Sequence, residues 1–142
     1  MKLNFDKKSL EISSRKVITG IISIEVYNDV FFPEEFWNDS IVIVLSSWLQ
    51  NASSFLEKAS TVTFAFFDGP FSFTISRKEG LDIIDLFRNA KSIQTYNADF
   101  KKFAHELIKT SKNVLQEINV RGWESDDIDK LKSSLKSCLI LI

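Results

Sequence analysis

The stretch from Ser40 to Leu56 contains no charged residue, and it constrains the fold more than any other part of the chain. At about 100° per residue its large apolar side chains fall on one side of a helix: Ile41, Val42, Val44, Leu45, Trp48, Leu49, Ala52, Phe55 and Leu56. The other side carries Ser, Gln and Asn, with Ile43 among them. Because a solvated helix face usually carries Lys and Glu, we expect this neutral side to be covered, either by another layer of the domain or by a binding partner.

The residues before this helix predict strands. Apolar and polar residues alternate over residues 3–5 and again over residues 10–12, and residues 6–9 between them predict a turn. Residues 19–26 are rich in β-branched side chains and predict a further strand. Pro33 closes this region and suits the first position of a helix, where its missing N–H is not needed.

The middle of the chain predicts a hairpin. Large apolar residues alternate with smaller ones in residues 61–67 and 71–76, and Asp68-Gly69-Pro70 between them has the chemistry of a turn. Residues 81–96 fit either a helix or two short strands. We prefer the strands, because they complete an antiparallel sheet.

The final third predicts two helices. Asn97 can cap the first and Gly122 ends it, with an apolar stripe of Phe100, Phe103, Ala104, Leu107, Ile108, Val114, Leu115 and Ile118. Ser125 caps the second, whose stripe reaches Ile142 and predicts a docked C-terminus. Because 142 residues suit one core, the sequence predicts a single α+β domain over residues 1–142. In it an antiparallel sheet packs against an amphipathic helix, which follows the first strands, and against the two C-terminal helices.

Residue counts exclude several kinds of catalytic site. His105 is the only histidine and Cys138 the only cysteine, so a Cys/His zinc site is excluded, and the four glycines are too scattered for a phosphate loop. We therefore expect no metal, no cofactor and no enzymatic activity. An alternative stays open, in which a scattered site uses Asp82 and Asp85 as an acid/base pair on one helix face, or His105.

Composition also bears on partners and location. The net charge of −1 argues against direct binding of nucleic acid, which usually needs a basic excess. No stretch approaches the ~18 consecutive apolar residues that cross a bilayer, so no membrane partner is expected. The N-terminus lacks the apolar run of a signal peptide and a lone cysteine suits a reducing compartment, so the sequence predicts a cytoplasmic protein.

Charged side chains group in three places. Glu25, Asp29, Glu34, Glu35 and Asp39 form an acidic stretch with no Lys or Arg between residues 18 and 56. It either attracts a basic partner such as a nuclease or forms acidic loops at a sheet edge. On the first C-terminal helix, Lys101, Lys102, His105, Lys109 and Lys112 share one side, which either binds an anionic surface or is simply solvated. Asp126, Asp127 and Asp129 suit the first turn of the last helix and lack the pattern of a calcium loop.

The loop between the two C-terminal helices contains a tryptophan. Trp123 lies between Arg121 and Glu124 and has the composition of an interface anchor. It equally suits a plug that closes the corner between the helices.

Two motifs carry a resemblance to known proteins. Phe32-Pro33-x-x-x-Trp37-x-Asp39 runs into the apolar helix with Trp48, and Phe66-Phe67-Asp68-Gly69-Pro70-Phe71 follows it. In this order, over residues 32–76, they resemble small immunity proteins that accompany bacterial contact-dependent growth inhibition and related polymorphic toxins. The resemblance implies binding and neutralisation of a cognate toxin domain in the cytosol, with no catalytic residues. That toxin is often a nuclease, so the acidic residues would mimic the nucleic acid that it expects.

These interpretations give one set of expected partner-binding residues. It comprises Asp29, Glu34, Glu35, Asp39, Ile43, Trp123, Glu124, Asp126, Asp127, Lys101, Lys102 and Lys109. The competing hypothesis is a self-associating structural or adaptor domain, which forms a homodimer through the neutral helix face around Ile43.

Overall fold

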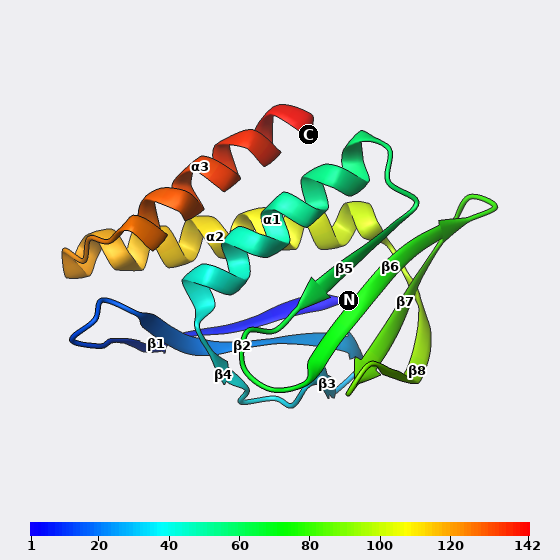
Figure 1. Ribbon diagram of the computed structural model, residues 1–142, viewed down its shortest axis with the longest axis horizontal. Coiled ribbons are helices and arrows are strands. Elements are labelled where there is room, and N and C mark those ends of the chain that lie inside the picture. The colour runs from blue at the N-terminus through cyan, green and yellow to red at the C-terminus, as the bar shows by residue number, and fades with distance from the viewer.

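Two antiparallel sheets lie beneath three helices in the computed structural model, which describes all of residues 1–142 (Figure 1). In chain order the elements are β1 (Lys2–Ile12), β2 (Ile18–Tyr27), β3 (Val30–Phe32), β4 (Asn38–Asp39), α1 (Ile41–Glu57), β5 (Thr61–Ala65), β6 (Phe71–Lys78), β7 (Leu81–Arg88), β8 (Lys91–Ala98), α2 (Phe100–Arg121) and α3 (Asp126–Leu141). The predicted α+β class is confirmed, and its strands divide between two sheets.

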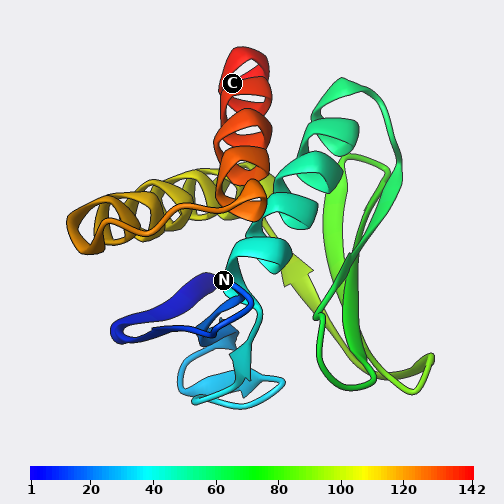
Figure 2. The same cartoon turned by 60° about the vertical axis from the view of Figure 1, so that its left-hand side comes forward.

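The two sheets are built from neighbouring strands of the chain. The first has the order β1-β2-β3, and the short β4 pairs with β2 beside β3. The second has the order β5-β6-β7-β8. Figure 2 shows the second sheet standing to one side of α1, while α2 extends over the first sheet. The β5–β6 hairpin and the two strands at residues 81–96 are therefore confirmed.

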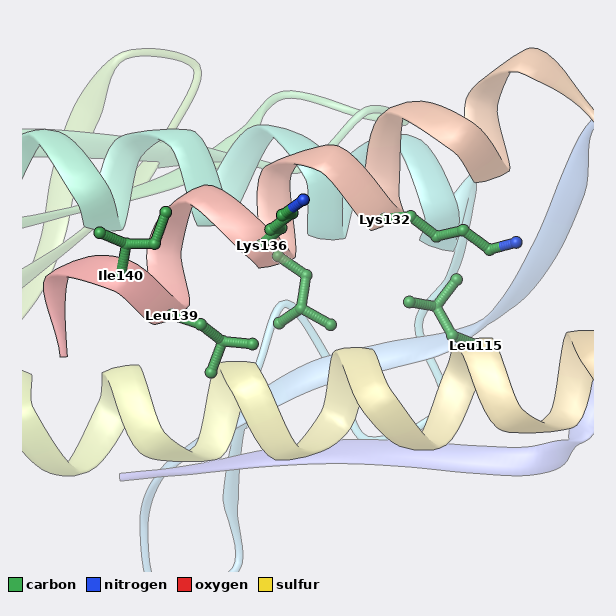
Figure 3. Close-up of a pocket in the computed structure, with 6 residues that line it drawn as sticks. Leu115, Lys132, Lys136, Leu139 and Ile140 are labelled. Atoms are coloured by element: carbon green, nitrogen blue, oxygen red, sulfur yellow. The ribbon is translucent and has the colours of Figure 1, made fainter.

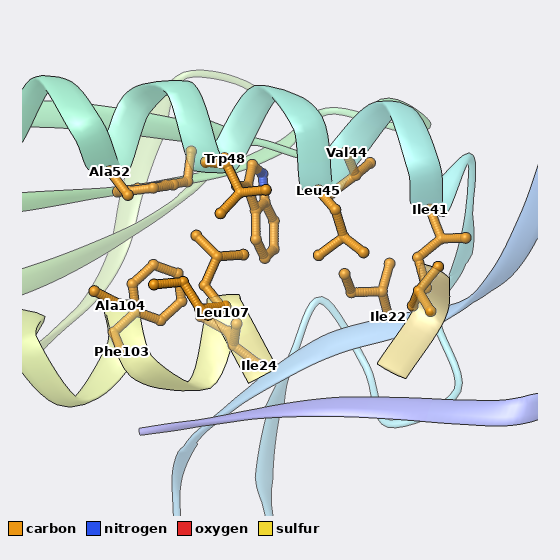
Figure 4. Packing of buried hydrophobic residues seen from close by; sticks show 14 of the residues in the cluster. Ile22, Ile24, Ile41, Val44, Leu45, Trp48, Ala52, Phe103, Ala104 and Leu107 are labelled. Atoms are coloured by element: carbon orange, nitrogen blue, oxygen red, sulfur yellow. The ribbon is translucent and has the colours of Figure 1, made fainter. Parts of the chain in front are cut away.

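Helix α1 joins both sheets to the other helices. Its apolar side faces Ile22 and Ile24 of β2 and Phe103 and Leu107 of α2 (Figure 4). The Trp48 ring stands edge-on to three phenylalanine rings in the second sheet or directly after β5, at 5.1–6.1 Å between centroids: Phe64, Phe66 and Phe73. Its indole N–H donates to the Ala65 carbonyl at 2.8 Å. The predicted apolar stripe is thus the centre of the core.

Helix α3 covers part of the neutral side of α1, at Ser46, whereas Ser47 and Ser54 of that side are exposed. The hydroxyls of Ser46 and Ser134 are hydrogen-bonded at 3.0 Å, and Gln50 Nε2 donates to Ser134 Oγ at 3.3 Å. Further along α3, the Cys138 thiol is buried, and burial raises its pKa. Of the two expectations for this side, the layer from the same domain is the one that the structure contains.

Strand β1 corrects the turn predicted at residues 6–9. The strand is continuous, but its register with β2 shifts between Asp6 and Glu11, which pair with Ile21 and Thr19. The extra residues form a bulge that turns Leu10 into the core, close to Gly20: a Cβ on Gly20 would lie 2.8 Å from the Leu10 side chain. Polar residues within a strand suit a bulge as well as a turn, so the sequence alone could not distinguish them.

Three predicted boundaries also differ from the structure. Pro33 does not begin a helix, because the chain continues through a loop into β4. Asn97 lies in β8, and the N-cap of α2 is Asp99, whose carboxylate accepts the Lys102 N–H at 3.1 Å. Gly122 ends α2 in the left-handed conformation, as predicted. The end of α3 is helical, but residues 139–142 are exposed and not docked.

Candidate protein-binding surface

Asp39 connects two loops that are distant in sequence. Its side chain is fully buried, and its carboxylate accepts hydrogen bonds from Trp37 Nε1 at 3.0 Å and from the Ser40 N–H at 2.7 Å. The Asp68 N–H donates to both carboxylate oxygens, at 3.1 and 3.2 Å. Burial raises the pKa of Asp39, and these three donors oppose that rise by favouring the charged form.

Trp37 fills the space between the same two loops. Its ring lies 5.2 Å from Phe71 and 6.4 Å from Phe66, edge-on to both. It also lies against Gly69, which has φ of +74° and whose Cβ, if present, would be 3.0 Å from the Trp37 ring. The two motifs that carry the resemblance, residues 32–39 and 66–71, therefore form one packed unit.

This unit presents aromatic side chains to solvent. Phe36 is 69% exposed and Phe67 is 62% exposed. Their neighbours in sequence, Trp37 and Phe66, pack inward against each other. At the β2–β3 turn Tyr27 is 67% exposed, opposite the exposed Val30. Large aromatic side chains in rigid loops are the usual anchors of protein interfaces.

The loops that expose these aromatic residues also carry acidic side chains. Asp29, Glu34, Glu35 and Asp68 are all exposed. β3, β4 and their connecting loop run along the lower edge of the molecule in Figure 1, beside the β5–β6 loop. We call this region the acidic aromatic surface, made of Tyr27, Asp29, Val30, Glu34, Glu35, Phe36, Phe67 and Asp68. Basic side chains border this region: the Arg88 guanidinium of β7 lies 5.1 Å from the centre of the Phe71 ring, and Lys2 and Lys102 line a hollow with Tyr27.

The structure divides the expected binding residues into separate groups. Asp29, Glu34 and Glu35 lie in the acidic aromatic surface, whereas Asp39 is buried and has a structural role, which corrects its place in the set. Ile43 is half-buried and precedes Ser46 and Gln50 on the side of α1 that faces α3. It is therefore not part of an open neutral face.

Trp123 closes the corner between α2 and α3. It is half-buried against the core, and the Arg121 guanidinium lies 5.0 Å from its ring. Arg121 also donates to the carbonyls of Leu10, at 2.6 Å, and Lys7, at 3.1 Å. These contacts give Trp123 and Arg121 a structural role, and Trp123 matches the plug rather than the interface anchor.

Of the remaining expected residues, only Lys102 borders the acidic aromatic surface, where it lines a hollow with Tyr27. Asp126 and Asp127 line a hollow with Arg15 and Lys16 of the β1–β2 turn, and Glu124 is exposed just before them. Three lysines of the predicted stripe are exposed on α2: Lys101, Lys102 and Lys109. The sequence thus named three surfaces, and the structure brings only the acidic stretch together with exposed aromatic side chains.

The alternative acid/base pair, Asp82 and Asp85 on one helix face, is wrong, because the two residues do not lie on a helix. Asp82 and Asp85 lie on strand β7, where side chains three positions apart point to opposite faces. Asp82 is held by Arg77 through two hydrogen bonds, at 2.7 and 3.1 Å, and also accepts the Phe100 N–H at 3.0 Å. The Arg77 guanidinium lowers the pKa of Asp82, which suits an ion pair rather than a proton donor.

Sequence reasoning missed the exposed aromatic residues of the site. Phe67 follows Phe66, and adjacent residues at a strand end point to opposite sides, so one of the two had to face outward. Phe36 and Trp37 repeat that situation. Pairs of consecutive aromatic residues were therefore the available signal.

Comparisons with known proteins give no match from which a function could be inferred. The chain matches no protein-family model, no curated protein and no solved structure. None of the three helices has both the length and the apolar character needed to span a bilayer.

Proposed function

We propose that this chain is an immunity protein, which binds a cognate bacterial toxin domain in the cytosol and neutralises it. The proposal begins from the resemblance of residues 32–39 and 66–71 to immunity proteins of polymorphic toxin systems. The observation that carries it is the junction of these two motifs, where the Asp39 carboxylate accepts the Asp68 N–H and each motif exposes a phenylalanine.

The acidic aromatic surface has two properties that suit tight binding. Its loops are held by buried hydrogen bonds and ring packing, so little conformational entropy is lost when a partner binds. Phe36 and Phe67 can then enter apolar pockets of the partner, while Glu34 and Glu35 meet basic groups around them. A nuclease is such a partner, because it must bind phosphates with basic side chains. Acidic side chains at its active site would exclude the nucleic acid.

The decisive experiment uses the adjacent gene. The C-terminal domain encoded by the neighbouring open reading frame is expressed in bacteria with and without this chain. We expect that domain to arrest growth alone and to become harmless when the chain is present. A harmless domain, or one that stays toxic in the presence of the chain, contradicts the proposal.

Variants then test the surface separately from the function. Phe36→Ala combined with Phe67→Ala should weaken binding of the toxin domain by at least about a hundredfold, because truncation of anchor residues typically costs 2 kcal/mol or more. Val120→Ala is the matched control, since Val120 is 74% exposed on α2, outside this surface. Equal affinities for the two variants would place the interface elsewhere while leaving the immunity function intact.

A further inference from the structure

A second surface lies on the helical side of the molecule, and the inference drawn from it does not depend on the proposed function. Helices α2 and α3 leave a groove of about 390 Å³ between them, towards the C-terminal half of α3 (Figure 3). It is lined by Leu115 of α2 and by Lys132, Leu135, Lys136, Leu139 and Ile140 of α3. The groove therefore has an apolar floor and no acidic side chain in its lining.

The end of α3 extends the apolar area beyond the groove. Leu139 is 41% exposed and Ile140 is 78% exposed, and the next two residues, Leu141 and Ile142, are also exposed. Leu141 and Ile142 line a second hollow of about 270 Å³, together with Phe55 of α1 and with other residues of α1 and α2. Four consecutive exposed apolar residues beside two hollows are far more than the scattered apolar side chains of an ordinary surface.

Basic side chains border this apolar area on both helices. Lys132 and Lys136 lie along the groove on α3. On α2, Lys101, His105 and Lys112 are exposed at helical spacing from Leu115, and Lys101 and His105 also line the second hollow. The acidic residues of α3, namely Asp126, Asp127 and Asp129, lie in its first turn, at the opposite end of the helix.

We infer that the α2/α3 groove binds an amphipathic, acidic helix of a partner protein. A groove between two helices accepts the side-chain ridge of a third helix, whose apolar stripe would contact Leu115, Leu139 and Ile140. Asp and Glu beside that stripe would pair with Lys132 and Lys136. A second copy bound symmetrically would instead place lysine against lysine, which is unfavourable.

The test uses a synthetic amphipathic peptide of about 15 residues, long enough for partial helicity, with a leucine stripe flanked by Glu. A second peptide has Lys in place of every Glu. Fluorescence anisotropy with the full chain should show saturable binding of the Glu peptide, at least about tenfold tighter than that of the Lys peptide. The combined variant Lys132→Glu and Lys136→Glu should reverse this preference, because it inverts the charge along the groove.

Two control variants separate the groove from general surface effects. Ile140→Glu should weaken binding of the Glu peptide at least about tenfold, whereas Val120→Glu, at an equally exposed apolar site of α2, should not. Lys130→Glu is the charge control, since Lys130 is exposed on α3 but does not line the groove. Thermal unfolding of each variant checks that the fold is retained.

Three results would overturn the inference. One is the absence of saturable binding of the Glu peptide, or equal binding of both peptides. Another is binding of phosphatidylglycerol vesicles that Ile140→Glu abolishes while neither peptide binds, which assigns the groove to a lipid surface. The last is a dimer in sedimentation velocity that Ile140→Glu dissociates, which assigns the groove to a second copy of the chain.

Discussion

The buried carboxylate of Asp39 accepts the backbone N–H of Asp68, across 29 residues of sequence, at 3.1 Å from Oδ1 and 3.2 Å from Oδ2. The bond joins the segment before α1 to the β5–β6 loop, and hence the first sheet to the second. The loops that expose Phe36 and Phe67 are therefore joined by this one side chain. Its burial and its donors explain why an acidic residue in an acidic stretch has a structural role.

Replacement of Asp39 should therefore destabilise the whole fold. Asp39→Ala leaves Trp37 Nε1 and the N–H groups of Ser40 and Asp68 without their acceptor, and we expect a loss of about 3 kcal/mol in the free energy of unfolding. Urea denaturation measures it. Glu34→Ala, at an exposed carboxylate, should change stability by less than about 0.5 kcal/mol. Similar values for the two variants would contradict the role assigned to Asp39.

Two adjacent serines test how α3 covers α1. Ser46 is buried against Ser134, whereas Ser47 is exposed. Ser46→Lys should lower the free energy of unfolding by at least about 2 kcal/mol, because it forces an unpaired charge into the α1–α3 contact. Ser47→Lys should have an effect below about 0.5 kcal/mol. If both variants are equally stable in thermal or urea unfolding, the neutral side of α1 is not covered as described.

The Arg77–Asp82 pair should make stability depend on pH on the acid side. Arg77 lowers the pKa of Asp82 in the folded protein below its ordinary value of 3.8. The unfolded chain then binds the proton more readily, so the stabilisation is complete above the ordinary value and is lost as the pH falls through the lowered pKa.

Asp82→Asn removes this contribution, so its stability deficit relative to the wild type should shrink as the pH is lowered. Urea unfolding over a pH series measures the deficit, and Arg77→Gln should show the same trend because it removes the partner charge. A deficit that stays constant down to strongly acidic pH would rule out the pair as its source.

In two of the hairpin turns of the second sheet, β6–β7 and β7–β8, substitutions should change stability in opposite directions. Asn89-Ala90 connects β7 to β8 with φ of 52° and 62°, a left-handed conformation that disfavours Ala. Ala90→Gly should raise the free energy of unfolding by about 0.5 kcal/mol. Gly80, with φ of +80° and open space around its missing Cβ, should lose about 1 kcal/mol when changed to Ala. Thermal unfolding compares the two, and effects of the same sign would be inconsistent with the turn geometry.

Local patterns in the sequence determined most of the elements. The apolar stripe of residues 41–56, the alternation of the β5–β6 hairpin, Gly122 and Ser125 all correspond to features of the structure. Each depends on the periodicity or conformational preference of a few neighbouring residues. The bulge in β1 was missed because it depends on the register with β2, which local pattern does not specify.

The neutral side of α1 shows what only the tertiary structure decided, namely which element packs against it. The absence of charge from residues 40–56 predicted a cover over this side, because burial of unpaired charge is costly, and the structure has that cover at Ser46 but leaves Ser47 exposed. The absence of charge did not determine which element covers this side, because a helix of the same chain and a binding partner both require uncharged side chains there. Likewise Asp39 and Glu34 are both acidic residues of one stretch, but Asp39 is buried and accepts the distant Asp68 N–H, whereas Glu34 is exposed. Such distinctions depend on contacts between residues far apart in the chain, which exist only once the sheets and helices have packed.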